Sequence, residues 1–154
     1  DLEHPVDQTY PYGHVTEKSI LAALQEMEGE QLQEPPVYSA KMIEGRRAYE
    51  YAREGEEVRM RRALVNIYEI APERIDLPDV TLRVRCSKGT YIRSIARDLG
   101  EKLSCGGHLT ALRRTRSGAF SEQDLYTIEE VERMLSSAPP TQSAPSVSPV
   151  SPVK

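Results

Sequence analysis

The 154-residue chain contains only two cysteines, Cys86 and Cys105, and has neither a CxxC pair nor a Cys/His cluster. Two cysteines cannot build a disulfide framework, and the missing clusters leave no candidate zinc site. We therefore expect a protein of a reducing compartment, the cytoplasm.

Long apolar runs are missing as well. No stretch of the sequence approaches the length that a bilayer-spanning helix requires, which argues against a transmembrane protein. The first five residues carry neither a basic start nor an apolar stretch, so they predict no signal peptide. Because the first residue is not Met, we expect the chain to be a fragment or a processed product.

Several catalytic signatures are also absent. The sequence contains no GxSxG, HExxH or GxxxxGK(S/T) motif, and no pair of carboxylates with an obvious pocket. The residues taken alone therefore indicate no nucleophile with its base.

The net charge of −4 conceals two regions of opposite sign. Residues 1–35 contain eight acidic residues and one basic residue, whereas residues 83–116 contain nine basic residues and two acidic ones. The nine basic residues are Arg83, Arg85, Lys88, Arg93, Arg97, Lys102, Arg113, Arg114 and Arg116. This basic block suits a polyanionic partner such as nucleic acid, and the alternative is a solvated face that binds nothing.

Hydrophobic periodicity and turn residues predict an α+β fold, in which a sheet carries helices on one face. The predicted helices cover residues 16–28, 48–53, 91–103 and 128–135, and the predicted strands cover 37–42, 64–70, 80–86 and part of 109–120. Thr16 or Ser19 is expected to cap the first helix, and Thr127 with Glu130 the last. The expected domain ends at residue 135, and the Ser/Pro-rich tail 136–154 is expected to be disordered.

The segment from Cys86 to Arg93 is the first candidate site. A strand ends in a turn with Gly89 and a helix follows, so backbone N–H groups can hold an anion there, and Lys88 adds positive charge. Tyr91 and Arg93 lie near the mouth of this turn, where a ring can stack on a base and a guanidinium can bind phosphate or carboxylate. The alternative is that Tyr91 belongs to the core and Lys88 is merely solvated.

The second candidate is the run from Leu112 to Arg116. Its three arginines can follow a phosphate backbone, with Leu112 as a wedge or a pocket wall. The alternative is an exposed edge strand that its charges keep from aggregating. Asp98 is interpreted as an ion-pair partner on a helix surface, and His108 as a capping or packing residue.

Two blocks of sequence resemble a known family. Residues 35–41 (PPVYSAK), followed by Gly45, Tyr49, Ala52-Arg53 and Gly55, form the first block. Residues 86–94 (CSKGTYIRS), followed by Asp98-Leu99-Gly100, His108-Leu109, residues 112–115 (LRRT) and Gly118, form the second. In order and spacing, from about residue 10 to about 135, they resemble the bacterial tRNA pseudouridine synthase B (TruB) family.

The resemblance implies a fold, a reaction and a set of site residues. It implies part of a pseudouridine-synthase-type mixed, mainly antiparallel sheet with helices packed on it. The family isomerises a uridine in the T-arm of tRNA to pseudouridine without metal or organic cofactor, and flips the target base into a pocket. An Asp is the nucleophile.

The same resemblance assigns roles to individual residues. Tyr91 would lie against the flipped uracil, and Arg93 would pair with the nucleophilic Asp and keep it ionised. Leu112 would line the uridine pocket. Lys88, Arg113 and Arg114 would lie along the RNA backbone.

The sequence departs from the family pattern at the nucleophile. The family's nucleophilic Asp lies in a GTLDP-like motif ahead of the PPxYSA block, and no such motif occurs here; only Asp1 and Asp7 precede Pro35. We therefore expect residues 1–135 to be a partial catalytic domain that lacks the nucleophile segment and is inactive alone. The alternatives are a non-catalytic RNA-binding module that retains the binding surface, and a purely structural domain.

Overall fold

The computed structural model describes residues 6, 8–56 and 60–137. The chain divides into two compact units, residues 1–112 and residues 113–154, and each is described by itself. None of the helices in the described part of the chain is long and apolar enough to cross a membrane.

The first unit opens with helix α1, Glu17–Glu26. Thr16 caps it, because Ser19 N donates to Thr16 Oγ1 and Thr16 N donates to Ser19 Oγ, as predicted. Ile20, Ala23 and Leu24 recur at helical spacing and are buried, so one face of α1 belongs to the core.

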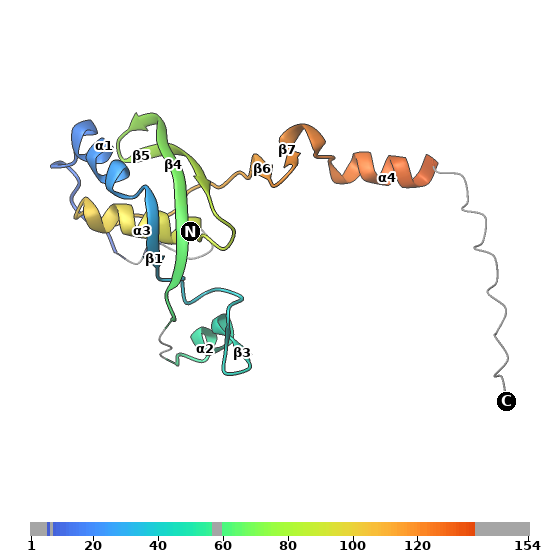
Figure 1. Cartoon of the computed structure of the whole chain (residues 1–154), viewed down its shortest axis with the longest axis horizontal. Helices are drawn as coiled ribbons and strands as arrows, with labels where there is room; N and C mark the ends of the chain where they lie inside the picture. Colours follow the sequence, from blue (N-terminus) through green and yellow to red (C-terminus); the bar gives the residue numbers. More distant parts are fainter. Residues whose placement is uncertain (1–5, 7, 57–59, 138–154) are drawn as a thin grey trace. The chain divides into compact units, whose positions relative to one another are not determined.

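A three-stranded antiparallel sheet, in the order β1-β4-β5, forms the centre of this unit (Figure 1). Its strands are β1 (Gly29–Gln33), β4 (Ala63–Asp76) and β5 (Asp79–Cys86). In the β1–β4 ladder Gly29 faces Ile67 and Gln33 faces Ala63. On β5, exposed residues alternate with half-buried Val80, Leu82, Val84 and Cys86, as the sequence predicted.

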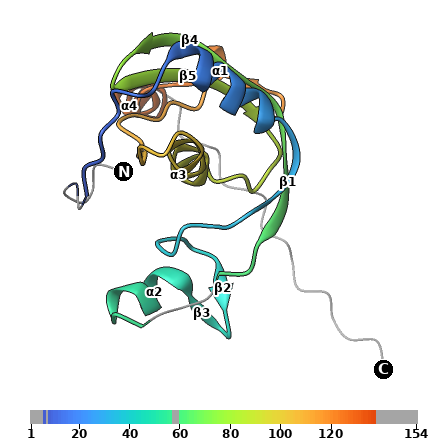
Figure 2. The ribbon, with the colours of Figure 1, turned by 90° about the vertical axis from the view of Figure 1, so that its left-hand side faces the viewer.

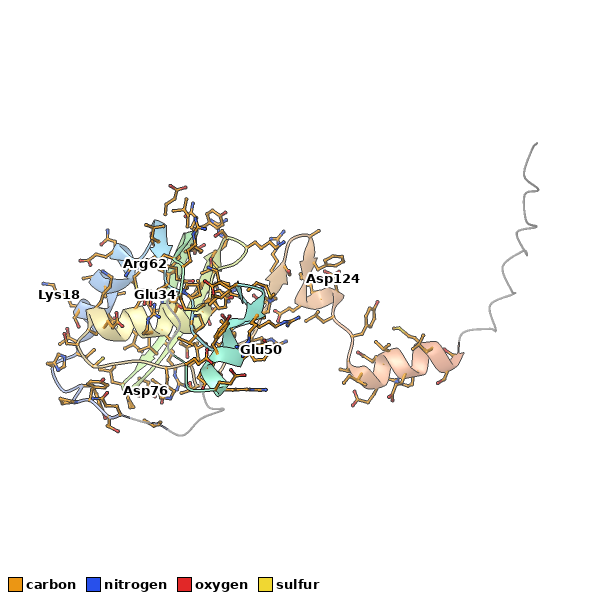
Figure 3. All side chains as sticks on the ribbon, turned by 90° about the horizontal axis from the view of Figure 1, so that it is seen from below. Lys18, Glu34, Glu50, Arg62, Asp76 and Asp124 are labelled. Atoms are coloured by element: carbon orange, nitrogen blue, oxygen red, sulfur yellow. The ribbon has the colours of Figure 1, made fainter. Side chains whose placement is uncertain are left out.

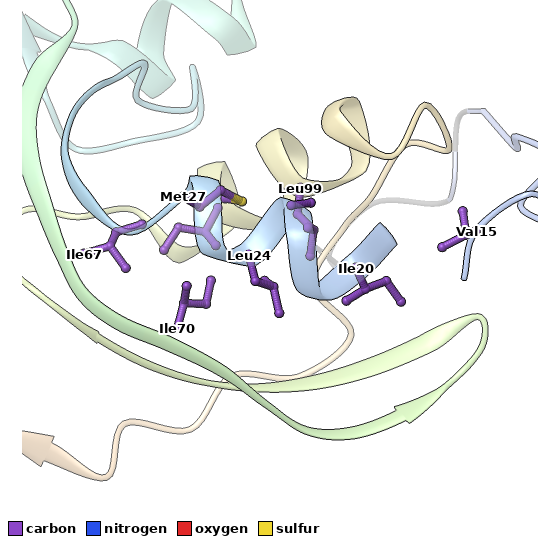
Figure 4. Packing of buried hydrophobic residues seen from close by; sticks show 9 residues of the cluster. Val15, Ile20, Leu24, Met27, Ile67, Ile70 and Leu99 are labelled. Atoms are coloured by element: carbon purple, nitrogen blue, oxygen red, sulfur yellow. The ribbon is translucent and has the colours of Figure 1, made fainter. Parts of the chain in front are cut away.

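The core lies where α1 and helix α3, Ile92–Lys102, pack with β4. Figure 4 shows Ile67 and Ile70 of β4 near Leu24 and Met27 of the α1 segment, and Leu99 of α3 in the same cluster. Burying a side chain of this size contributes about 1.5–3 kcal/mol. The observed architecture is therefore the α+β arrangement of antiparallel strands and packed helices that was expected.

Residues 34–56 leave the sheet after β1, and the chain is back in the sheet at β4 (Figure 2). They contain β2 (Met42–Ile43), β3 (Arg46–Arg47) and α2 (Ala48–Arg53). The turn between β2 and β3 at Glu44-Gly45 and the helix 48–53 were both predicted.

The strand predicted over residues 37–42 was wrong. Only Met42 within it is in a strand, and residues 37–39 form bends. The backbone groups of this segment bond to the start of α2 instead of to a ladder: Tyr49 N donates to Ser39 O, and Ala48 N donates to Lys41 O. Pro35 and Pro36 lack the N–H groups that a ladder requires, which favours this loop.

Strand β1 was not predicted, because its sequence Gly-Glu-Gln-Leu-Gln has a single apolar residue. Pairing with β4 gives these polar residues their strand geometry. Glu34, directly after β1, forms an ion pair with Arg62, directly before β4, with Arg62 Nε 3.3 Å from Glu34 Oε2 (Figure 3).

The second unit contains β6 (Arg116–Ser117), β7 (Phe120–Ser121), a 3-10 turn η1 (Glu122–Asp124) and α4 (Ile128–Ser137). Thr127 caps α4 as predicted, because Glu130 N donates to Thr127 Oγ1 and Thr127 N donates to Glu130 Oε2. The helix runs two residues beyond its predicted end at 135. Residues 138–154 of the predicted disordered tail lie outside the described residues.

Candidate functional site

The turn between β5 and α3 is anchored on β4. Ser87 N donates to Asn66 O, Asn66 N donates to Ser87 Oγ, and Thr90 Oγ1 donates to Ser87 O, at distances of 2.8, 2.9 and 2.9 Å. Gly89 has φ +89°, a conformation that a residue with a Cβ rarely adopts, so the glycine is required here. Lys88 is exposed on this turn, as an anion-binding role demands.

Tyr91 is the capping residue of α3, and its backbone is held by one side chain. Gln33 Oε1 accepts from Tyr91 N at 2.8 Å, and Gln33 Nε2 donates to Tyr91 O at 3.2 Å. Gln33 is only 3% exposed. Tyr91 is half-buried, so it is not a fully buried core residue.

Arg93 lies in the first turn of α3 and is half-buried. Its Nη2 donates to the backbone oxygen of Tyr38 at 2.8 Å. Ser94 Oγ, from the next residue, and Arg97 Nη2, from one turn further, both donate to Glu34 O, at 2.8 and 3.2 Å. Residues 33–38, which we term the strap, therefore run along the first two turns of α3.

Ser39 follows the strap directly. It is 5% exposed, and its Oγ has no hydrogen-bond partner among the described residues. A buried hydroxyl without a partner is unfavourable, which makes this position unusual within the PPxYSA block.

Gly100 of the second block and Gly107, which precedes His108, have a packing role. A Cβ on Gly100 would overlap the backbone of Gly106 and Gly107, and a Cβ on Gly107 would overlap the carbonyl oxygen of Ala96. Helix α3 and the segment after it approach so closely that only glycine fits. His108, next in sequence, is exposed.

The basic block is partly neutralised within the chain. At least five of its nine cations form ion pairs, namely Arg83 with Glu73, Arg85 with Glu69, Arg97 with Asp98, Lys102 with Glu26 and Arg113 with Glu122. Asp98 is therefore an ion-pair partner on the helix, as interpreted from the sequence. The charge count of this block overstates the charge that it offers to a partner.

The ion pair between Glu26 and Lys102 also sets a protonation state. Lys102 donates to Glu26 Oε2 at 2.8 Å, and this hydrogen bond together with the positive charge lowers the pKa of the Glu26 carboxyl. The pair links the C-terminal turns of α1 and α3.

The structure brings only some of the predicted site residues together. Tyr91 and Arg93 share the strap as their support, and Lys88 lies on the adjoining turn. Leu112 is 63% exposed at the end of the first unit, whereas Arg113 and Arg114 belong to the second. Gln33, which sequence reasoning missed, forms two side-chain hydrogen bonds to the backbone of Tyr91.

Two curated relatives of the chain carry the same name. The chain is 45% identical over 135 residues to a protein of Phocaeicola vulgatus and 48% identical over 139 residues to one of Bacteroides thetaiotaomicron, both named tRNA pseudouridine synthase B. Each match covers 88% of this chain but 57% and 58% of the relative. The chain therefore spans a little over half the length of these relatives.

Two solved structures resemble about three quarters of this chain. One is described as the crystal structure of a Cbf5-Nop10-Gar1 complex, with a TM-score of 0.57 and 35% identity over 74% of this chain and 30% of the other. The second is an H/ACA RNP bound to a substrate RNA containing 2'-deoxyuridine, with a TM-score of 0.52 and 32% identity over 74% and 27% of the two chains.

Family models match the sequence in two consecutive segments. Residues 1–92 match the N-terminal domain of TruB family pseudouridylate synthases. Residues 93–148 match the C-terminal domain of tRNA pseudouridylate synthase B. The two matches meet inside the CSKGTYIRS block and together extend past the boundary expected at residue 135. The chain belongs to the TruB family of pseudouridylate synthases.

Proposed function

We propose that these residues form the part of a tRNA pseudouridine synthase that holds the target uridine and the RNA around it. The reaction is the isomerisation of a T-arm uridine to pseudouridine, after the base is flipped out of its loop. The observation that carries the proposal is the joint support of Tyr91 and Arg93 by the strap, in a chain of this family. No metal or organic cofactor enters the proposal.

Arg93 is proposed to orient and ionise the nucleophilic carboxylate. The hydrogen bond from Arg93 Nη2 to the Tyr38 carbonyl anchors one end of the guanidinium. A planar guanidinium can form two parallel hydrogen bonds to a carboxylate, and its charge lowers the pKa of that carboxyl. A lysine at this position would carry the same positive charge, but its ammonium group cannot form two parallel hydrogen bonds to a carboxylate.

The other predicted residues are proposed to bind substrate. Tyr91 lies against the uracil, and Leu112 lines its pocket. Lys88, Arg113 and Arg114 lie along the phosphate backbone, where cations contribute affinity that falls as salt rises. Such a protein works where tRNA is, in the cytoplasm, and the two cysteines of this chain are free thiols.

The missing nucleophile segment leaves a second function open for this chain, that of a non-catalytic RNA-binding module. These 154 residues contain no GTLDP-like motif, so the reaction requires a carboxylate that they do not supply. We propose that the chain alone binds RNA and does not isomerise uridine. This same observation favours the alternative of a non-catalytic RNA-binding module.

A chimera distinguishes the two functions. The portion of the Bacteroides thetaiotaomicron relative that this chain does not match is joined to the chain, and pseudouridine formation is measured on a T-arm stem-loop. We expect isomerisation by the chimera and none by the chain alone. A matched chimera with Arg93→Lys is expected to bind the RNA but to turn over slowly.

Two results would contradict the proposal. Pseudouridine formation by the chain alone would show that its own residues supply the nucleophile. A chimera that folds and binds RNA but never isomerises uridine would favour the binding module.

A further inference from the structure

Gln33 is a buried polar side chain, and both ends of its amide bond to one residue. Its Oε1 accepts from the N–H of Tyr91, and its Nε2 donates to the C=O of the same residue. The two residues are 58 positions apart in sequence. Burial of an amide is unfavourable unless its hydrogen bonds are satisfied, so this burial depends on Tyr91.

The two bonds constrain the direction of the Tyr91 side chain. They hold the peptide groups on both sides of the Tyr91 Cα, which fixes its φ and ψ near −92° and 113°. Once both peptide planes are fixed, the Cα–Cβ bond can point in only one direction. The Tyr91 C=O also accepts from Ser94 N and Ile95 N at the start of α3, but the N–H of a capping residue has no intrahelical partner, so Gln33 supplies the restraint on that side.

We propose that Gln33 is a positioning residue that aims Tyr91 at the flipped base. Gln33 touches the backbone of Tyr91 and acts on the substrate only through it. This inference rests on the proposed function, because that function supplies the base. The alternative is that Gln33 only ties β1 to α3 and contributes stability.

Two substitutions separate these roles. Gln33→Met keeps the shape of the side chain but removes both hydrogen bonds. Gln33→Glu keeps the acceptor for Tyr91 N–H and regains a donor to Tyr91 C=O only when the carboxyl is protonated. Gln31→Met and Gln31→Glu are the matched controls, because Gln31 lies on the same strand and donates to Met27 O instead.

The first measurement is NMR of the full chain without RNA. In Gln33→Met we expect the Tyr91 N–H to exchange with solvent about tenfold faster, relative to the amide of Ile67 in the core. In Gln33→Glu we expect the Tyr91 amide resonance to approach its wild-type position as the pH is lowered through the titration of the new carboxyl. The Gln31 variants should show neither effect.

The second measurement compares two T-arm stem-loops, one with the target uridine and one abasic at that position. We expect the wild-type chain to bind the uridine form more tightly. Gln33→Met should lose this preference and keep its affinity for the abasic form. A role in stability alone would weaken binding of both stem-loops equally.

Each outcome bears on a separate claim. Unchanged Tyr91 exchange in a folded Gln33→Met chain would overturn the positioning role and leave the proposed function standing. Equal binding of the two stem-loops by the wild-type chain would contradict the proposed function, and the NMR data would still decide whether Gln33 holds Tyr91. If Gln33→Met does not fold, the pH series on Gln33→Glu decides within a single protein.

Discussion

The ammonium group of Lys102 lies 2.8 Å from Oε2 of Glu26, so an ion pair joins the last residue of α1 to the last residue of α3. Both helices also contribute residues to the core that they share with β4. The ion pair is exposed, so its contribution to the stability of the fold depends on pH and on salt.

The lowered pKa of Glu26 predicts a pH-dependent stability. A carboxyl whose pKa is lower in the folded state contributes stability above its unfolded pKa, about 4.3, and loses it as the pH falls through the folded value. We expect Glu26→Gln to lower the melting temperature at pH 7 and low salt. That difference should shrink as the pH falls below about 4.3 and disappear once Glu26 is protonated in the folded state as well. A difference that persists at acid pH would contradict the assignment to this ion pair, and Lys102→Met should reproduce the effect at pH 7.

Gly100→Ala should destabilise the first unit strongly. The new Cβ would overlap the backbone of Gly106 and Gly107, which cannot move as a flexible side chain can. We expect a loss of about 3 kcal/mol or more in the free energy of unfolding, measured with urea. Gly13→Ala is the control, because nothing lies within 4 Å of its Cβ position. Equal stability of the two variants would mean that α3 and the 105–107 segment do not approach this closely.

Ser39→Ala should leave the stability of the chain unchanged or raise it by up to about 1 kcal/mol, because the lost hydroxyl has no partner among the described residues. Ser94→Ala removes the hydrogen bond to Glu34 O and should cost about 1 kcal/mol. Urea unfolding of both variants tests the contrast. If Ser39→Ala lost as much stability as Ser94→Ala, the Ser39 hydroxyl would have to form a hydrogen bond in the folded protein.

RNA binding by the chain should be weak and should fall as salt rises, because phosphate contacts release counterions. Lys88→Ala should make the slope of log affinity against log salt shallower by about one unit. Arg83→Ala is the matched control, because Arg83 already pairs with Glu73 at 2.6 Å. Equal changes in slope would mean that the whole basic block binds RNA, ion pairs included.

Arg93→Lys, in the chimera that carries the nucleophile, should lower turnover much more than RNA affinity. Lys keeps the positive charge but cannot form two parallel hydrogen bonds to a carboxylate. Single-turnover kinetics and binding measured on the same stem-loop test this. Equal losses in both quantities would assign Arg93 to RNA binding.

Sequence patterns predicted the elements whose own residues specify them. The stripe of Ile20 and Leu24, the caps Thr16 and Thr127, and the alternation along β5 identified α1, α4 and β5. The patterns did not predict strand β1, because its strand conformation depends on pairing with β4 and not on local hydrophobicity. Residues 37–42 looked like a strand, but their hydrogen bonds go to α2.

The sequence predicted those site residues that belong to a local motif. It did not predict residues whose role depends on a contact with a distant segment of the chain. Tyr91 and Arg93 were found from the CSKGTYIRS block. Gln33 was missed because its role depends on a partner 58 positions away. The available signal was a polar residue at the end of a segment that leads into two prolines, which alone does not indicate burial.

Residues 34–62 leave the sheet next to the point where they return, since Gln33 and Ala63 face each other in the β1–β4 ladder. The ladder brings the two ends of this excursion together whatever lies between them, so its length and sequence can change at little cost in loop-closure entropy. Loop closure therefore sets only a weak limit on the number of residues between the strap and β4, whereas Gly45, Tyr49 and Gly55 within this excursion belong to the first family block. The strap has no such freedom, because Gln33, Glu34 and Tyr38 must keep their spacing against α3.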